Sequence, residues 1–316
     1  MAAWELFLQR CFDGITNGAI YGSLALALVI IYRSTGLLNF AQGEMATFAT
    51  YVALVLHTPQ SPVLKGTGLA SLLPGTPWPI WASILGAMAF AFAFGVVVER
   101  TVIRPLEGRS AIAVVSVSLG VFLTINALVE QWWRPIPRAF PSVFPNEPDD
   151  YLLVAGARLR WERLGIWLTL LAVLAVLYPI MRYSKIGLAF RAVSSNREMS
   201  ALMGIRVSRT VMLGWGLAAA IGALSGSLVA NSVLLEPNMM VRLLIYSFAA
   251  ATLGGLDSPG GAILGGLLVG VAQTMIGGYV GFIGSEFSLV TALVVIMVVL
   301  LVRPTGLFGT RRVERV

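Results

Sequence analysis

Long runs without a charged residue alternate along the chain with short polar segments. Seven of these runs are long enough to cross the roughly 30 Å hydrocarbon core of a bilayer as helices. They cover residues 14–32, 45–64, 66–98, 110–129, 164–181, 210–235 and 258–285. Two shorter runs, 243–256 and 287–302, add a marginal or half span and a full last span. The pattern therefore predicts eight or nine membrane-spanning helices.

The runs are apolar throughout, whereas the strands of a membrane barrel alternate polar and apolar residues. The predicted fold class is therefore all-α, a polytopic transmembrane helix bundle that forms a single domain over residues 1–316. Glu5, Gln9 and Asp13 share one helical face, so residues 1–13 form either a short interfacial helix or an extension of the first span. No basic start and small-residue cleavage site precede the first run, so we expect it to be retained.

The composition indicates that most of the chain is surrounded by lipid. Hydrophobic residues make up 57% of the sequence and charged residues 12%, against about 25% charged residues in ordinary soluble domains. The net charge of +7 comes from basic residues that are dispersed between the apolar runs. This dispersal argues against nucleic acid as a partner and indicates membrane lipid instead.

The basic residues also predict the orientation of the chain. If successive runs cross the bilayer in alternate directions, fourteen of the twenty-two lysines and arginines fall on one side. They are Arg33, Arg100, Arg104, Arg109, Arg182, Lys185, Arg191, Arg197, Arg206, Arg209, Arg303, Arg311, Arg312 and Arg315. Because basic loops face the cytoplasm, we expect the 182–209 loop and the C-terminus on the cytoplasmic side of a bacterial inner membrane. The loop at 130–163 fits this assignment least well, because its arginines fall on the opposite side.

Several kinds of chemistry are excluded by missing residue types. Histidine and cysteine occur once each, as His57 and Cys11, which excludes a Cys/His metal site, a histidine triad and a disulfide. The lysines are Lys65 and Lys185, and neither follows a glycine, so the chain has no phosphate-binding loop of the G-x-x-x-x-G-K-[ST] form. We therefore expect no enzymatic activity and no bound cofactor in this chain, and any ATP hydrolysis belongs to a partner.

The most polar membrane segment lies between Arg33 and His57. Four of its side chains are expected to line a passage through the bundle: Asn39, Gln42, Glu44 and Thr47. A carboxylate at the centre of a membrane helix costs about 2.5–3.5 kcal/mol, so Glu44 should face the bundle interior or water. Gly36 and Gly43 would allow the helix to break in this segment. The alternative is that Glu44 lies near the cytoplasmic end and reaches the headgroups.

Gly14, Gly18 and Gly22 recur every four residues and share one face of the first predicted helix. Faces made of small residues let membrane helices approach closely, and this close packing replaces the hydrophobic driving force that lipid cannot supply. We expect this glycine face to pack against another helix of the bundle.

The basic stretch 182–209 contains a short amphipathic helix of its own. The residues that define it are Ser195, Glu198, Met199, Leu202, Met203 and Gly204. The serine and the glutamate have the spacing of a capping box, three apolar side chains follow at helical spacing, and the glycine ends the helix. The apolar face of this helix needs a surface, which is either the bilayer or a cytoplasmic partner.

Several of these segments resemble a known family. Residues 18–45, with their central Asn-Phe-Ala-Gln-Gly-Glu, resemble the opening of the high-affinity branched-chain amino acid permeases (LivH type) of ABC importers. The ending Arg-Pro-Thr-Gly-Leu-Phe-Gly at 303–309 looks like the C-terminal signature of that family. Residues 198–205 are similar to the E-A-A-x-x-x-G coupling motif of importer permeases, although Met199 and Ser200 stand where two alanines are usual.

The resemblance runs from about residue 8 to 309 and implies one half of a pore in a larger importer. The partners it implies are a second, related permease subunit, two cytoplasmic ABC ATPases that use ATP, and a periplasmic substrate-binding protein. The helix at 195–204 would then couple the ATPases to the membrane. The implied substrates are branched-chain or other hydrophobic amino acids, with urea or short amides as the alternative within the same superfamily.

Functions of other classes are the competing interpretations. In a proton-coupled secondary transporter, Glu44 would be the proton site and no ATPase would be needed. Against this, no lysine, arginine or histidine lies at short helical spacing from Glu44 within the membrane, and the capped helix would have no role. An intramembrane enzyme would need a carboxylate pair, a histidine or a metal cluster within a span, and none is expected there, since the single histidine, His57, is interpreted as an interfacial residue at a helix end. A purely structural subunit is the remaining alternative.

Overall fold

A computed structural model of the chain describes residues 3–59, 76–106, 108–279, 288–303 and 305–309. Three basic residues used above to assign the sides of the membrane lie outside the described residues, namely Arg311, Arg312 and Arg315, and so does Lys65. The ends of several predicted apolar runs lie outside them too. Within the described ranges the chain is helical, apart from connecting segments and one short hairpin.

Every predicted apolar run contains a helix. These helices are α1 (Ala3–Thr35), α2 (Gln42–His57), α3 (Ile80–Val98), α4 (Ala111–Trp133), α5 (Trp161–Tyr183), α8 (Val207–Val233), α9 (Met239–Gly254), α10 (Pro259–Tyr279) and α11 (Ser288–Val302). In the described part of the chain, six helices are long and apolar enough to cross a membrane, and α2, α9 and α11 are shorter. The protein is therefore an all-α polytopic helix bundle, as the sequence predicts.

The first helix includes the N-terminal residues. The α1 helix is continuous from Ala3 to Thr35, without a break between residues 3–13 and the apolar run. Whether residues 3–13 lie in the membrane interface or extend the first span stays a prediction. The glycine at position 14 lies within the helix, and its backbone packs closely against another helix, as described below.

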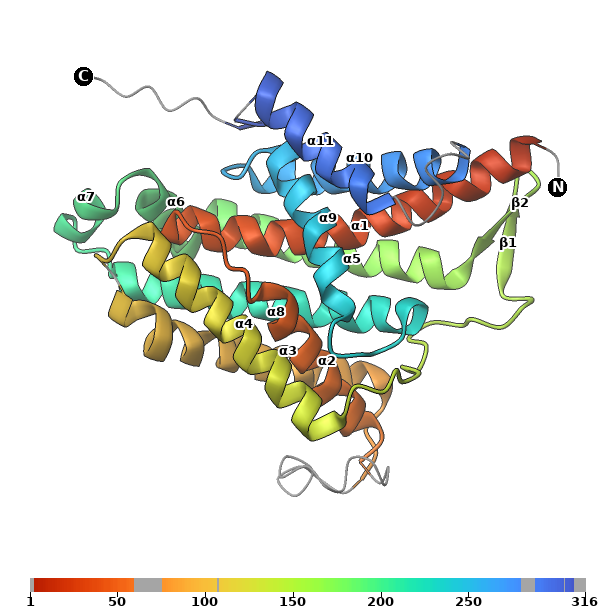
Figure 1. Cartoon of the computed structure of the whole chain (residues 1–316), viewed down its shortest axis with the longest axis horizontal. Helices are drawn as coiled ribbons and strands as arrows, with labels where there is room; N and C mark the ends of the chain where they lie inside the picture. Colours follow the sequence, from red (N-terminus) through yellow and green to blue (C-terminus); the bar gives the residue numbers. More distant parts are fainter. Residues whose placement is uncertain (1–2, 60–75, 107, 280–287, 304, 310–316) are drawn as a thin grey trace. The chain divides into compact units, whose positions relative to one another are not determined.

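The helices pack as two compact units that are interleaved along the sequence (Figure 1). Unit 1 contains residues 1–29, 144–182 and 242–316, and unit 2 contains residues 30–143 and 183–241. The division into two units was not anticipated by the prediction of one domain.

Unit 1 contains a β-hairpin that the sequence analysis did not predict. Strand β1 (Tyr151–Val154) pairs antiparallel with β2 (Ala157–Arg160). The two residues between them, Ala155 and Gly156, both have positive φ, 50° and 86°. Two positive φ values are characteristic of the tight turn whose twist matches that of a hairpin. Strands of four residues carry too little alternation to be predicted from hydropathy.

Unit 2 is built around α2. This helix packs against α3, α4 and α8, and all of its residues from Gln42 to Leu56 are buried. Glycines in α8 make the close approach possible. A Cβ at Gly226 would lie 2.5 Å from Thr50 Oγ1, and a Cβ at Gly222 would lie 2.8 Å from Gln42 Nε2. The polar start of α2 is therefore held inside a helix bundle.

One end of unit 2 gathers the basic segments that the sequence pattern placed on one side of the membrane. Thr35, Leu106, Arg109 and Arg197 line a common cavity of about 160 Å³ there. Arg33 also contacts this group of segments, since its Nη2 donates to Ser194 Oγ at 3.4 Å. The C-terminal ends of α2 and α8 lie at the other end of the unit (Figure 1).

Candidate functional site

The first helix breaks at Gly36, as predicted. Gly36 has φ 73°, and its N–H donates to the carbonyl oxygen of Tyr32 at 2.7 Å. The chain then runs without helical structure until α2 begins at Gln42. Gly43, which we also expected to permit a break, lies inside α2. Only Gly36 adopts the positive φ that glycine tolerates without strain, so the segment contains one break.

Asn39 and Gln42 form a buried polar group at the start of α2. Asn39 Oδ1 accepts from the N–H of Ala41 at 3.0 Å, and Asn39 Nδ2 donates to Gln42 Oε1 at 3.4 Å. Gln42 Nε2 donates to the carbonyl oxygen of Ala218 in α8 at 2.8 Å. These bonds attach the non-helical segment to α8 and satisfy polar groups that lipid could not.

Glu44 belongs to a second polar group, which faces α4. Its side chain is 0% exposed, and Oε2 accepts from Nδ2 of Asn126 at 3.3 Å. The same nitrogen lies 3.0 Å from Asn238 Oδ1. Glu44 Oε1 has no hydrogen-bond partner among the described residues. The interpretation in which Glu44 reaches the headgroups is therefore wrong, and a buried acceptor without a protein partner favours contact with water or a solute.

The hydroxyl of Thr47 bonds within its own helix, and the predicted role of this residue in a passage stays a prediction. Thr47 is buried, and its hydroxyl donates to the carbonyl oxygen of Gly43 in the same helix at 3.2 Å. The four residues predicted to line a passage are thus divided into the Asn39–Gln42 group, Glu44 facing α4, and a threonine satisfied by its own helix. They do not share one face of α2.

The sequence analysis missed the partners of Glu44. Asn126 is an isolated amide in the predicted run 110–129, and isolated polar residues inside membrane helices tend to be functional. Asn126 could therefore have been identified from the sequence as a candidate residue. Asn238 lies in a connecting segment just before α9, and its approach to Asn126 depends on packing between distant parts of the chain, which no local pattern reveals.

An aromatic cluster begins one helical turn beyond Glu44. The ring of Phe48 lies 5.4–5.9 Å, between centroids, from four other rings: Phe90, Phe94, Trp132 and Trp133. Tyr51 stacks on Trp133 at 4.8 Å. The arrangement in unit 2 therefore places a cluster of packed aromatic rings one helical turn along α2 from the buried carboxylate.

We expect Glu44→Gln to lower the transport rate by about tenfold or more, which corresponds to about 1.4 kcal/mol in the limiting step, without loss of folded protein. The glutamine keeps the side-chain shape and an oxygen acceptor for Asn126 but removes the negative charge. Thr47→Val is the matched control one turn away, because its hydroxyl bonds only within α2. Uptake rates normalised to purified protein measure both variants, and a wild-type rate for Glu44→Gln would contradict the prediction.

The residue that caps the short amphipathic helix is the one after the predicted Ser195. Helix α6 (Lys185–Ser195) continues through Ser195, and α7 (Arg197–Leu202) is capped by Asn196, whose Oδ1 accepts from the N–H of Met199 at 2.9 Å. Glu198 is then the second residue of the helix and not the third, as a capping box requires. The serine cannot serve as the cap because its own backbone is helical.

The predicted end of this helix at Gly204 is confirmed. Gly204 has φ 82°, its N–H donates to the carbonyl oxygen of Ala201, and that of Ile205 donates to Ser200, both at 3.0 Å. This pair of bonds is a Schellman motif, which needs positive φ at the glycine. Leu202 and Met203 are 80% and 79% exposed, so the α7 helix presents an apolar surface at the end of unit 2 that carries the basic segments.

The glycine face of α1 lies against α10 within unit 1. Cβ atoms at Gly14 and Gly18 would lie 2.8 and 2.7 Å from the Cα atoms of Val271 and Leu267. Gly22 is in similar contact with Ile263, where an added Cβ would lie 3.1 Å from the carbonyl oxygen. The backbones of the two helices therefore touch, which is the packing expected of small-residue faces in membranes.

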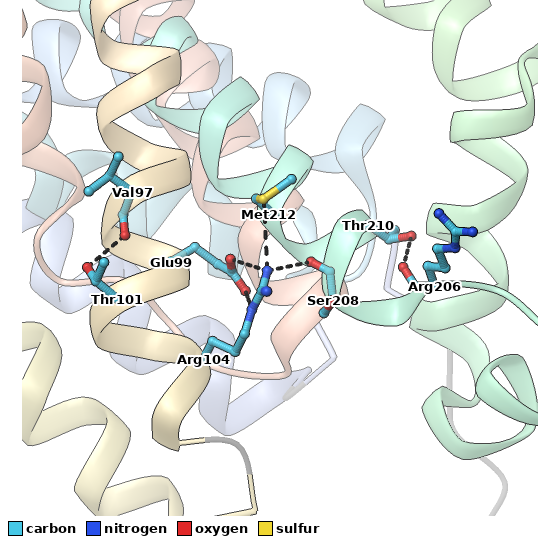
Figure 2. A network of polar contacts seen from close by, with 8 residues as sticks. All are labelled: Val97, Glu99, Thr101, Arg104, Arg206, Ser208, Thr210 and Met212. Atoms are coloured by element: carbon cyan, nitrogen blue, oxygen red, sulfur yellow. Dashed lines mark hydrogen bonds and ion pairs between the residues drawn. The ribbon is translucent and has the colours of Figure 1, made fainter.

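An ion pair directly after α3 contacts the start of α8 through its arginine (Figure 2). Glu99 opens the π-helical segment η1 (Glu99–Ile103), and Arg104 opens the 3-10 segment η2 (Arg104–Leu106). Arg104 Nη2 lies 3.0 Å from Glu99 Oε2 and 3.5 Å from the carbonyl oxygen of Ser208. The sequence analysis treated Arg104 only as a basic loop residue. The structure shows that it links two helices beside the connection from α7 to α8.

Removing the arginine of this pair should be more damaging than neutralising the glutamate. The Glu99 side chain is 0% exposed, whereas that of Arg104 is 30% exposed and can turn toward water. We therefore expect Arg104→Met to cost about 3 kcal/mol or more of stability and Glu99→Gln clearly less. Thermal unfolding of the two purified variants in detergent compares them, and equal losses would show that the pair is screened by solvent.

A bundle of apolar helices that buries a carboxylate and several amides defines the class of polytopic membrane transport proteins. Residues 10–302 match the family described as branched-chain amino acid transport system / permease component. The chain therefore belongs to this family and is a multi-pass membrane transport permease.

Curated relatives of this family match almost the whole chain. The high-affinity branched-chain amino acid transport system permease protein LivH of Escherichia coli (strain K12) is 30% identical over 98% of both chains. The corresponding protein BraD of Pseudomonas aeruginosa is 29% identical, again over 98% of both. A solved structure described as PsaBC from Streptococcus pneumoniae in complex with Fab covers 95% of this chain and 92% of that chain at 13% identity, and its TM-score of 0.48 is too low to inform the fold.

Proposed function

We propose that this chain is the membrane-spanning permease subunit of an ABC importer that takes up branched-chain and other hydrophobic amino acids. The observation that carries the proposal is the family match over residues 10–302, together with relatives of that specificity aligned over nearly their full length. The buried carboxylate and the aromatic cluster one helical turn along α2 from it support the proposal, because an apolar amino acid needs both polar and apolar contacts on its way through the bundle.

The proposed assembly contains four partner chains of three kinds. A second, related permease completes the pore, two cytoplasmic ABC ATPases hydrolyse ATP, and a periplasmic binding protein delivers the substrate. The permease itself binds no cofactor. The exposed apolar face of α7 is the proposed contact with an ATPase, since its Leu202 and Met203 need a surface to cover them.

The proposed orientation follows from charge. The end of unit 2 that carries Arg33, Arg109 and Arg197 faces the cytoplasm of a bacterial inner membrane, in keeping with the bias of basic loops toward that side. The arginines of the tail favour the same side for the C-terminus. Cysteine labelling with a membrane-impermeant reagent at positions in the 182–209 loop would test this orientation, since labelling in intact spheroplasts would contradict it.

Reconstitution tests the function directly. The permease, its related partner and the two ATPases are placed in liposomes with the binding protein outside and ATP inside, and uptake of radiolabelled leucine is followed. We expect uptake that requires ATP and the binding protein. Uptake that persists without ATP and stops when an ionophore collapses the proton gradient would favour the secondary transporter instead. Competition by urea or acetamide but not by isoleucine or valine would favour the amide alternative.

A further inference from the structure

A second polar cavity lies at the opposite end of unit 2 from the α7 helix. Its volume is about 420 Å³, which falls within the range of about 300–1,000 Å³ typical of small-molecule sites. Its lining residues come from the end of α2 and the segment that follows α4: Leu54, His57, Thr58, Arg138, Ala139, Phe140 and Pro141. No residue of the polar groups around Asn39 and Glu44 belongs to this lining.

Arg138 is held firmly at the edge of this cavity. Its backbone N–H donates to the carbonyl oxygen of Leu235 at 2.9 Å, and the N–H of Leu235 donates back to Arg138 at 2.9 Å. Its Nη2 donates to the carbonyl oxygen of Trp133. The backbone of Arg138 is therefore held by two bonds and its guanidinium by one before any ligand arrives, which reduces the entropic cost of binding.

The same arginine retains donor capacity that the protein does not use. Its Nε is buried and has no hydrogen-bond partner among the described residues. Neither of the two ion pairs found in the described ranges involves Arg138. A buried guanidinium N–H without an acceptor costs free energy, and a carboxylate is the acceptor that the guanidinium fits best.

Two further donors lie beside Arg138. Tyr51 stacks on Trp133, and the hydroxyl of the first and the Nε1 of the second are buried without partners in the part of the chain that the structure describes. Trp133 is also the residue whose carbonyl oxygen Arg138 contacts. Three neighbouring residues thus each retain an unused polar hydrogen, and of the three Arg138 lines the cavity.

Apart from His57 and Thr58, the rest of the lining is apolar. Leu54, Ala139, Phe140 and Pro141 supply it, and His57 is oriented by a contact between its Nδ1 and the carbonyl oxygen of Trp78 at 2.9 Å. A fixed cation at one edge and aliphatic and aromatic walls elsewhere complement a small molecule that has a carboxylate at one end and a branched hydrocarbon group at the other.

We propose that this cavity is a carboxylate-binding subsite in which Arg138 receives the substrate before it reaches the buried groups around Glu44. The identity of the substrate as a hydrophobic amino acid rests on the proposed function, whereas the recognition of a carboxylate rests on Arg138 and its surroundings. The permease would then contribute to selectivity itself, by rejecting molecules of similar shape that lack the carboxylate.

The test uses the complete membrane complex in lipid nanodiscs, without the binding protein, and measures equilibrium binding of radiolabelled leucine. Two competitors separate the functional groups: 4-methylpentanoate keeps the carboxylate and lacks the ammonium, and leucinamide keeps the ammonium and lacks the carboxylate. We expect 4-methylpentanoate to compete and leucinamide to compete at least about tenfold less well, as the loss of a charged hydrogen bond implies.

Arg138→Gln should weaken leucine binding by about tenfold to a hundredfold and should abolish the preference for the acid over the amide. Arg134→Gln is the matched control, because Arg134 is an exposed arginine in the same segment that does not line the cavity. A merely structural role of Arg138 would lower the amount of folded complex without changing the ratio of the two competitors.

Ala139→Trp keeps the test decisive if Arg138→Gln folds poorly. Ala139 is exposed and lines the cavity, so the larger side chain fills the space without entering the core. We expect it to reduce leucine binding at unchanged yield. The proposal is overturned if leucine does not bind, if the amide competes as well as the acid, or if Ala139→Trp binds leucine normally.

The outcomes separate this subsite from the proposed function. ATP-dependent leucine uptake with no effect of Arg138→Gln or Ala139→Trp would overturn the subsite and leave the function standing. Arg138-dependent binding of 4-methylpentanoate in a complex that does not transport hydrophobic amino acids would support the subsite and contradict the assigned substrate.

Discussion

Replacing Gly18 with leucine is expected to lower the yield of folded, membrane-inserted protein by about tenfold or more. The expected loss is large because a Cβ at this position would meet backbone atoms, at 2.7 Å from the Cα of Leu267 and 2.8 Å from the carbonyl oxygen of Gly266. Backbone atoms cannot move aside as a flexible side chain can. Overpacking of well-packed sites costs about 1–3 kcal/mol, and here the two helices must separate along their whole contact.

A matched glycine in another membrane helix provides the control. Gly120 lies in α4, is exposed, and would place an added Cβ more than 4 Å from other parts of the protein. Gly120→Leu should therefore leave the yield close to that of the wild type. Size-exclusion chromatography of the two variants in detergent, with thermal unfolding of the monodisperse fraction, measures the difference. Equal yields and melting temperatures would show that the α1–α10 contact contributes little.

The helices themselves were predictable from the apolar runs, because a chain in lipid has to satisfy its backbone hydrogen bonds within each span. The residues at which the helices begin and end were harder to predict. The run 66–98 is longer than α3, which begins at Ile80, directly after Pro79. Proline is well suited to precede the first turn of a helix because it lacks an N–H. Hydropathy is insensitive to that backbone property, so it could not find the start of the helix.

The capping box predicted at Ser195 shows what a local sequence pattern cannot determine. Ser195 and Asn196 are both good cap residues, and the serine also has a glutamate at the right spacing. The choice between them depends on how far α6 continues, which is decided by the packing of Phe190 and Val193 in unit 2. Since tertiary contacts extend the preceding helix through Ser195, the cap moves to the next residue.

The residues of the candidate site could be predicted from the sequence, but their arrangement in space could not. Polar side chains are rare in membrane spans because lipid disfavours them, so Asn39, Gln42 and Glu44 could be identified from the sequence. Their partners lie far along the chain, at Ala218 and Asn126. Because a helix turns by about 100° per residue, Gln42 and Glu44 face different neighbours. A one-dimensional pattern cannot show which helix each side chain meets.

Coupling to the ATPase is the function that should be lost most completely by a change outside the membrane. We expect Leu202→Asp to abolish ATP-driven uptake while the protein still inserts and folds, because Leu202 is 80% exposed and makes no core contact that aspartate would disturb. A charge at the centre of an apolar contact would be left without a partner when the ATPase docks. Leu153→Asp, at another largely exposed leucine, in β1, is the control and should transport normally.

Gly204→Val tests whether the angle of the helix matters as well as its surface. Gly204 has φ 82°, a conformation that costs a residue with a Cβ roughly 1–2 kcal/mol, so valine should change the way the chain leaves α7. Gly108→Val applies the same backbone strain in another loop, since Gly108 has φ 83° and open space around its Cα. Only the first variant should release the ATPase in detergent or allow it to hydrolyse ATP without uptake. If Leu202→Asp and Gly204→Val both transport at wild-type rates with hydrolysis still coupled, the apolar face of α7 rests on the bilayer surface and the ATPase binds elsewhere.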